Sequence, residues 1–367
     1  MIFNILYYIC GKNIFSMQKK TSQLSFSSLA LAKRKLKTVF FDQMNALINW
    51  KEVEQTIEKY YRKGKSTDGR PAYNGLLLFK ICLLQTWYGL SDYEIEEQVN
   101  DSLSFMRFLD LTLEDSVPDH SVISRFRTTL SELNVYEELL VTINKQLEKK
   151  NILVNKGIIV DASVTDTLRK PRGKKEYQVV EDRKEENIDL IKVAVNNAVS
   201  VKIASNVDKE AGWIKKGGKT RYGYKKHVAT NEEGLVLALV TTAANESDTI
   251  YLKEVVDKVK IEKWKRVRAD KGYSSCKNRE YLKKKELKNG IMYKAEKNKP
   301  LNVHQQRFNN IVSQVRYKIE RTFGSIKLWF KTGIARYVGR SKIHAQHLIE
   351  SIAYNLYRSP GIIMSNT

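Results

Sequence analysis

The spacing of apolar residues predicts a helical first part of the chain, residues 39–150. Its densest apolar run, residues 74–90, predicts a buried helix that Gly89 ends. Ser91 followed three residues later by Glu94 has the spacing of a capping box and predicts the start of the next helix. We therefore expect a compact all-helical unit here.

One helix of this unit carries two basic side chains. Pro118 and Asp119 end one element, and the segment SVISRFRTTL that follows predicts a helix from which Arg125 and Arg127 project. This segment fits the DNA-facing helix of a helix-turn-helix, and it fits an ordinary helical bundle with surface arginines equally well.

The pattern changes at residue 157. GIIVDASVT, residues 157–165, predicts a buried strand, and residues 222–230 and 235–245 predict two strands joined at Asn231–Gly234 as a hairpin. Further strands are predicted at 266–273 and 290–296, and helices at 248–260, 308–330 and 341–358. This order predicts an α/β domain.

Residues 168–220 interrupt that pattern. The basic segments RKPRGKK and KKGGKTR contain Pro or Gly and predict exposed loops, while residues 185–202 between them predict a helix. Trp213, beside the second basic segment, could stack on an unpaired base but fits an ordinary hydrophobic contact better.

The charge balance adds a partner to this picture. Among 367 residues, 64 Lys and Arg against 41 Asp and Glu give a net charge of +23, and 42% hydrophobic residues are typical of a globular protein. Solubility requires a net charge of only about 2–8 on a small domain. The excess predicts a polyanionic partner, most simply nucleic acid, and the length predicts two domains.

Cysteines and the N-terminus indicate the compartment. Three dispersed cysteines form no CxxC pair, which fits a reducing cytoplasm, and the five histidines give no zinc site. The apolar start of the chain is shorter than the ~20 residues of a membrane span and lacks the features of a secretory signal. We expect translation to start at Met17 and not at Met1.

Three acidic residues stand out by context. Asp161 ends the apolar run 157–160, Asp270 ends RVRAD, and Glu320 lies in the predicted helix 308–330. Carboxylates at strand ends lie where α/β sheets place their sites, and a helix can add a third. Three carboxylates suit Mg²⁺, and two such ions about 3.5–4 Å apart carry out phosphodiester chemistry.

Each acid taken alone has a simpler interpretation. Arg316, Glu320 and Lys327 share one helix face, so on spacing alone an intrahelical ion pair explains Glu320 best. An Asp at a strand end is often a helix cap or turn residue. The catalytic interpretation depends on all three acids occurring together in one basic chain.

The chain resembles bacterial DDE transposases of the insertion-sequence-five family between Thr38 and Ser359. The matching segments, in order, are GRPAYNGLLLFKICLLQTWYGLSDYEIEEQVNDSLSFMRF, VPDHSVISRFRTTL, GIIVDASV, WIKKGGKTRYGYKKHVAT, TTAANESDT, RADKGYSS and RYKIERTFGSIKLWF. The resemblance implies that Asp161, Asp270 and Glu320 are the catalytic, metal-binding residues. The family signature continues from Arg316 through Glu320 to Lys327, but its Tyr position holds Ser313 here, with Tyr317 as a weak substitute.

The resemblance also implies an architecture. We expect residues 1–37 to be disordered or a wrongly assigned extension. Residues 38–152 are then a helical DNA-binding or dimerisation domain, and residues 153–360 a ribonuclease-H-like catalytic domain with an insertion at about 168–220.

The implied partners are double-stranded DNA, as transposon ends and as target, and further copies of the chain in a homodimer or larger synaptic complex. The expected cofactors are two Mg²⁺ or Mn²⁺ ions, with no small-molecule cofactor and no membrane, in the cytoplasm at the bacterial nucleoid. For DNA contacts we select seven basic residues: Arg316, Lys327, Lys225, Lys226, Arg125, Arg127 and Lys271. Lys225 and Lys226 are expected at the end of a strand.

Other functions fit parts of the sequence. A non-catalytic DNA-binding repressor derived from a transposase would share the charge but would not need all three acids. A structure-specific nuclease of the same fold would cut DNA without joining ends. A tyrosine recombinase would need a Tyr nucleophile with an Arg/His/Arg cluster, and we find no such set.

Overall fold

The computed structural model describes residues 39–61, 72–154, 156–171, 177–179, 199–201, 206–296 and 298–366. The N-terminal helices are α3 Val39–Leu47, α4 Trp50–Glu58, α5 Gly75–Tyr88, α6 Asp92–Asp101, α7 Leu103–Phe108, α8 His120–Glu132 and α9 Val135–Lys149. The later helices are α10 Asp248–Asp257, the 3₁₀ turn η1 Lys271–Tyr273, α11 Cys276–Lys284, α12 Val303–Trp329 and α13 Arg340–Asn366. The strands are β1 Gly157–Asp166, β2 Tyr177–Val179, β3 Val199–Val201, β4 Gly212–Lys216, β5 Lys219–Thr230, β6 Val236–Ala243, β7 Arg266–Ala269 and β8 Lys288–Ile291.

Local signals explain the helix ends. Ser91 and Glu94 form the predicted capping box at the start of α6. Gly89 ends α5 in the left-handed conformation, with φ of 67°, and a Cβ there would lie 3.1 Å from the carbonyl oxygen of Phe330. Both sequence predictions are confirmed, because capping depends on neighbours in the chain.

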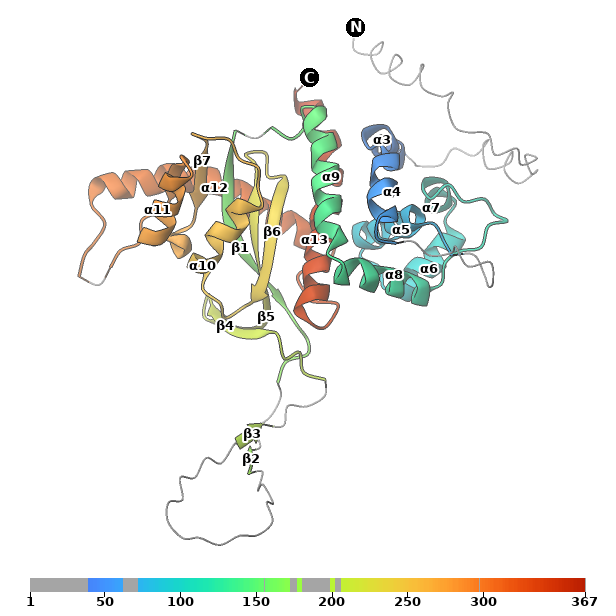
Figure 1. The fold of residues 1–367 in the computed structure, drawn as a ribbon, viewed down its shortest axis with the longest axis horizontal. Helices are drawn as coiled ribbons and strands as arrows, with labels where there is room; N and C mark the ends of the chain where they lie inside the picture. Colours follow the sequence, from blue (N-terminus) through green and yellow to red (C-terminus); the bar gives the residue numbers. More distant parts are fainter. Residues whose placement is uncertain are drawn as a thin grey trace.

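The main sheet has a mixed strand order. β5 lies between β6 and β1 and pairs antiparallel with both, and β1, β7 and β8 follow as parallel neighbours. The short strand β4 pairs antiparallel with the first residues of β5. Three antiparallel strands followed by two parallel ones, with helices on both faces, make a ribonuclease-H-like fold (Figure 1). The predicted α/β fold class is confirmed.

Successive side chains of β1 point to opposite faces of the sheet and join two apolar layers. Ile158 and Val160 face the cluster that includes α10 and α11, while Ile159 faces the cluster of α9, α12 and α13. All three residues are fully buried, which explains why this strand reads as a continuous apolar run.

The helical N-terminal part shares its core with the catalytic part. One apolar cluster runs from Phe41 to Ile362 and includes residues of the N-terminal helices, the sheet and α13. Buried Trp87 of α5 donates its indole N–H to the carbonyl of Ala353 in α13 at 2.9 Å. Figure 1 shows α9 and α13 between the sheet and the smaller helices. The predicted domain boundary after residue 152 therefore does not separate two hydrophobic cores.

The structure corrects the predicted insertion at two places. Lys215–Arg221 is not a loop: it forms a hairpin of β4 and β5, whose turn residues Gly217 and Gly218 have φ of 59° and 76°. Residues 199–201 of the predicted helix 185–202 form a strand that pairs with β2, and the rest of that prediction lies outside the described residues. The expectation for residues 1–37 lies outside them as well.

The last predicted strand, 290–296, is shifted. β8 ends at Ile291, level with the end of β7. The next residues turn away because the side chain of Asn309 in α12 bonds both the N–H and the carbonyl of Tyr293, at 2.8 and 3.0 Å.

Among the described residues, no helix is both long and apolar enough to cross a membrane.

Candidate active site

Two of the three predicted acids lie on adjacent strands. β7 pairs with β1 only as far as Ala269 opposite Val160, so Asp270 and Asp161 each follow the last pair. Asp161 is not at a strand end as predicted, because β1 continues to Asp166 along β5. The end of β7 nevertheless leaves Asp161 beside an open edge. The two aspartates therefore lie at one edge of the sheet, but Asp161 does so because β7 ends beside it and not because its own strand ends.

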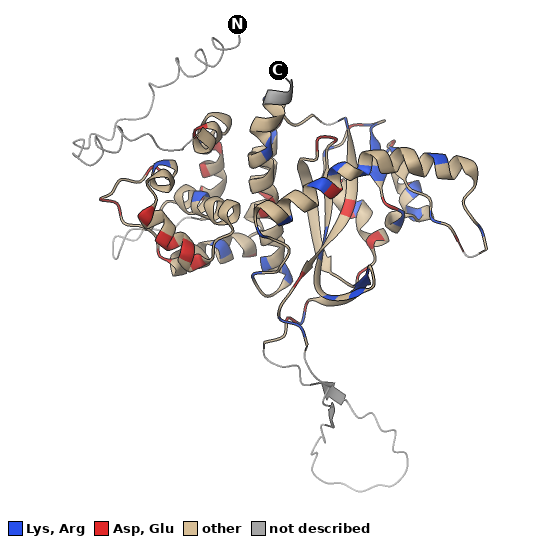
Figure 2. Cartoon of the chain, turned by 180° about the vertical axis from the view of Figure 1, so that it is seen from behind, with Lys and Arg blue, Asp and Glu red and all other residues tan. Residues whose placement is uncertain are grey.

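Helix α12 brings the third acid to this edge. Glu320 lies in the middle of α12, and its side chain is 61% exposed. Asp161 and Asp270 are less exposed, at 15% and 33%. Figure 2 shows acidic and basic positions next to one another where α12 crosses the sheet.

A single guanidinium connects the three acids. The Nη2 of Arg316 lies 2.7 Å from Asp161 Oδ2 and 3.5 Å from Glu320 Oε1, and its Nη1 lies 3.3 Å from Asp270 Oδ1. The Nε of Arg316 is buried and has no hydrogen-bond partner among the described residues. Arg316 is thus the internal counter-ion of the acid cluster.

Burial and charge oppose each other at this cluster. Burial raises the pKa of the Asp161 carboxyl, the guanidinium of Arg316 opposes this rise, and the charge of Asp270 adds to it. Burial by itself would lower the pKa of Arg316, but Asp161 and Asp270 raise it. The cluster therefore favours a cation between its carboxylates.

The donor set fits divalent metal ions such as Mg²⁺. Three carboxylates from β1, the β7–η1 junction and α12 converge on one positively charged group. In the arrangement described, they surround the guanidinium, and no group of three His, Cys, Asp or Glu side chains among the described residues is close enough to hold a metal ion. We expect metal binding by these acids to displace Arg316 from its place between them.

Two lysines selected for DNA contact are buried. Lys225 and Lys226 lie in the middle of β5 and not at its end. Lys225 donates to Asp248 Oδ1 at 2.7 Å, and Lys226 donates to Glu350 Oε2 at 3.0 Å, where both side chains are 3% exposed. Because these ammonium groups already have carboxylate partners inside the protein, we remove them from the expected DNA contacts.

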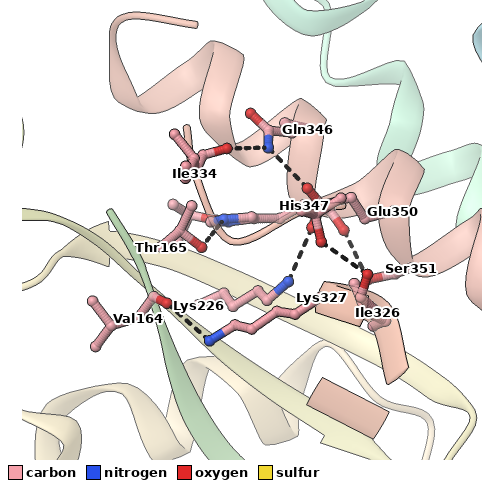
Figure 3. A network of polar contacts seen from close by, with 12 residues as sticks. Val164, Thr165, Lys226, Ile326, Lys327, Ile334, Gln346, His347, Glu350 and Ser351 are labelled. Carbon is pink, nitrogen blue, oxygen red and sulfur yellow. Dashed lines mark hydrogen bonds and ion pairs between the residues drawn. The ribbon is translucent and has the colours of Figure 1, made fainter. Parts of the chain in front are cut away.

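The buried Lys226 pair belongs to a polar network between the sheet and α13 (Figure 3). Gln346 donates to Glu350 Oε1 at 2.8 Å, and the ring of His347 contacts Thr165 and Thr241 at 2.9 and 2.8 Å. Lys327 extends beside Lys226 and donates to the carbonyl of Val164 at 3.2 Å. Burial, together with the positive charges of Lys226 and Arg221, lowers the pKa of Lys327 to about 8.

Breaking this buried pair is expected to destabilise the fold. Glu350→Gln leaves the Lys226 ammonium in the core without a carboxylate, so we expect it to lower the free energy of unfolding by about 3–5 kcal/mol in a urea titration. The control is Glu286→Gln, which breaks an exposed pair with Lys263 and is expected to cost at most about 1 kcal/mol. Equal losses in the two variants would contradict a structural role for the buried pair.

The remaining selected residues divide by exposure. Arg127 does not project into solvent: it pairs with Asp92 at 2.7 Å and stacks on the ring of Tyr337 at 4.4 Å. Arg125 is exposed on α8, and Lys271 is exposed directly after Asp270. The pairing of Arg127 with another helix is not visible in the local sequence pattern.

Comparison with known proteins identifies the class. Residues 152–356, more than half of the chain, match the family described as "Transposase DDE domain", and residues 29–129 match a family described as a transposase domain. The chain belongs to the DDE transposases. It is similar to the "Transposase for insertion sequence element IS1106" of Neisseria meningitidis serogroup B, with 35% identity over 237 residues, 64% of this chain and 76% of that relative.

Two solved transposase structures show only a weak likeness to this chain. The piggyBac transposase synaptic complex with hairpin DNA gives a TM-score of 0.41 at 9% identity, over 89% of this chain and 75% of the other. The Mos1 transposase paired-end complex gives 0.20 at 10% identity, over 83% and 82%. The assignment rests on the sequence matches. Membership of the insertion-sequence-five family stays a prediction.

Proposed function

We propose that this protein binds the inverted-repeat ends of its own insertion sequence, cleaves the DNA there and joins the ends to a target duplex. One observation carries the proposal: three carboxylates from separate elements meet around one cation at the open edge of β1. The matching DDE family supports it, and so does the name of the IS1106 relative.

Asp161, Asp270 and Glu320 are the proposed metal ligands, and the family implies divalent ions. Two Mg²⁺ or Mn²⁺ ions held there would activate the attacking hydroxyl and stabilise the departing oxygen. Hydrolysis breaks a phosphodiester and frees a 3′-hydroxyl. That hydroxyl then attacks a target phosphodiester, so one bond forms as another breaks.

The basic residues around the acids bind the substrate in this proposal. Arg316 neutralises the acid cluster before the reaction, and on leaving it can donate two parallel hydrogen bonds to a phosphate. Exposed Lys271 adds positive charge beside Asp270. Lys327 lies two turns after Glu320 on α12, and its half-buried ammonium is a further proposed phosphate contact.

The helical part is the proposed end-binding or dimerisation unit, residues 38–152. Exposed Arg125 on α8 supports a DNA contact there, whereas buried Arg127 supports the packing of α8. We propose a homodimer or larger synaptic complex, because joining two transposon ends needs two sites.

A strand-transfer assay tests the function. Purified protein with labelled end DNA, a target plasmid and Mg²⁺ is expected to give joined products, and EDTA is expected to abolish them. Cleavage without joining would indicate a nuclease of the same fold. Binding without cleavage would indicate a non-catalytic repressor, and either outcome contradicts the proposal.

A further inference from the structure

The hairpin of β4 and β5 is a basic arm that the acid cluster does not use. Its strands pair from Gly212 with Gly223 to Lys216 with Lys219. The turn between them consists of Gly217 and Gly218, which both have positive φ. A Cβ atom added to either glycine would have no neighbouring atom within 4 Å. This geometry is that of a tight two-residue hairpin, and it holds the tip clear of the rest of the protein.

The exposed charge of this arm is positive. Lys215, Lys216 and Lys219 are all exposed, and among the described residues none of their side chains has an ion-pair or hydrogen-bond partner. Strand alternation and the pairing register place Lys216 and Lys219 on one face, with Lys215 on the other. Figure 2 shows basic positions gathered at this end of the sheet.

The base of the arm is fixed. Arg221 forms a bidentate pair with Asp166 at the end of β1, at 2.7 and 2.6 Å. On the other face Trp213 packs on Tyr222, with ring centroids 4.8 Å apart, and the Tyr222 hydroxyl donates to the carbonyl of Asp208 at 2.6 Å. The lysines therefore stand on a paired two-stranded ribbon with a fixed base and not on a loop.

The arm belongs to the strand that pairs with β1 beside the acid cluster. Val228 of β5 pairs with Asp161, and Lys219 lies nine residues earlier on the same strand, a path of at most about 30 Å at the rise of a strand. The ammonium of Lys327 lies between the two, because it donates to the carbonyl of Val164, whose partner on β5 is Lys225. Duplex DNA rises about 3.4 Å per base pair, so this path corresponds to at most about nine base pairs.

We propose that the β4–β5 hairpin is a duplex-binding arm, whose Lys216 and Lys219 contact backbone phosphates within about one helical turn of the phosphodiester at the acid cluster. This inference rests on the proposed function, because cleavage at the acids fixes the position of the duplex. Lysine is a point charge without base-reading geometry, so the contact is independent of sequence. The duplex is either the transposon end or the target.

The test is the salt dependence of DNA binding by the double variant Lys216→Gln/Lys219→Gln. Its affinity for end DNA and for an unrelated duplex of equal length is measured by fluorescence anisotropy over a range of salt concentrations. Each lost phosphate contact lowers the slope of log affinity against log salt by about 0.9, so we expect a slope lower by about 1.8 and a tenfold or greater loss of affinity at low salt.

A charge-matched control separates this contact from a general loss of charge. Lys283→Gln/Lys284→Gln removes two exposed charges from α11, which lies far from the β4–β5 hairpin (Figure 1). This variant is expected to leave the slope unchanged. All variants should melt at the wild-type temperature, because these lysines are exposed.

The two duplexes identify the bound DNA. Loss of affinity for both duplexes supports a general backbone contact. Loss of affinity only for end DNA assigns the arm to the transposon end, and loss of affinity only for the unrelated duplex assigns it to the target. Equal salt-dependence slopes for the hairpin variant and the control would contradict the DNA-binding role of the arm while leaving the proposed function intact. A wild-type protein that binds neither duplex would overturn the proposed function itself.

Discussion

Asp161→Asn is expected to lower strand transfer by about a thousandfold or more and to leave DNA affinity at the wild-type level. The change removes a carboxylate that has only 15% of its side chain exposed and that contributes a ligand at the proposed metal site. Loss of a negative charge does not weaken the attraction for phosphate. Strand-transfer rates and a binding titration with the same end DNA give the two quantities.

The other two acids provide an internal check on this prediction. Asp270→Asn and Glu320→Gln are expected to cause losses of similar size, and a double variant should be no worse than the singles, because residues that act as one unit do not contribute additively. Glu262→Gln changes a carboxylate with 81% exposure and is expected to keep full activity. Full activity of any of the three variants would remove that acid from the site.

Arg316→Gln is expected to lower the free energy of unfolding by about 3–5 kcal/mol without divalent ions. The substitution removes the only group that lies between Asp161, Asp270 and Glu320 in the described part of the chain, and three carboxylates then repel one another near the surface of the core. Urea unfolding in EDTA measures the loss. Arg321→Gln changes an exposed arginine on the same helix and should stay within about 0.5 kcal/mol of wild type.

Mg²⁺ is expected to restore much of this stability. A cation that binds only the folded state stabilises it by about 2.7 kcal/mol at one hundred times its dissociation constant, and in Arg316→Gln the carboxylates have no competing guanidinium. The rise in melting temperature on adding Mg²⁺ should therefore be larger for Arg316→Gln than for wild type. A larger rise for wild type would contradict the idea that Arg316 and the metal compete for the same acids.

Local patterns predicted the parts of the fold that depend on neighbours in the chain. The capping box of Ser91 and Glu94 and the end of α5 at Gly89 follow from backbone requirements of a few residues, and both are present. The buried strand at 157–165 followed from a continuous apolar run, because both faces of β1 are covered. The acids themselves stood out by their local context, their assignment as metal ligands came from matching motifs, and their catalytic role stays a prediction.

Where local patterns were misleading, a residue from a distant segment decided the outcome. Lys226 reads as a basic residue on a strand, but Glu350, 124 residues later, pairs with it in the core. Arg127 reads as a surface residue of a helix, but Asp92 and Tyr337 enclose it. The segment around Gly217 reads as a loop because glycine favours turns, and only its pairing partners show that the turn joins two strands.

The sequence by itself determined the class of this protein, its fold class, most helix and strand positions and the three acids to examine. Only the tertiary structure decided which charges face solvent and which face each other: it placed Arg316 among the acids, buried Lys225 and Lys226, and left Lys216 and Lys219 exposed on a hairpin. The physical reason is that secondary structure depends on spacing over a few residues. The environment of a charge depends on long-range packing, which the spacing of residues along the chain does not contain.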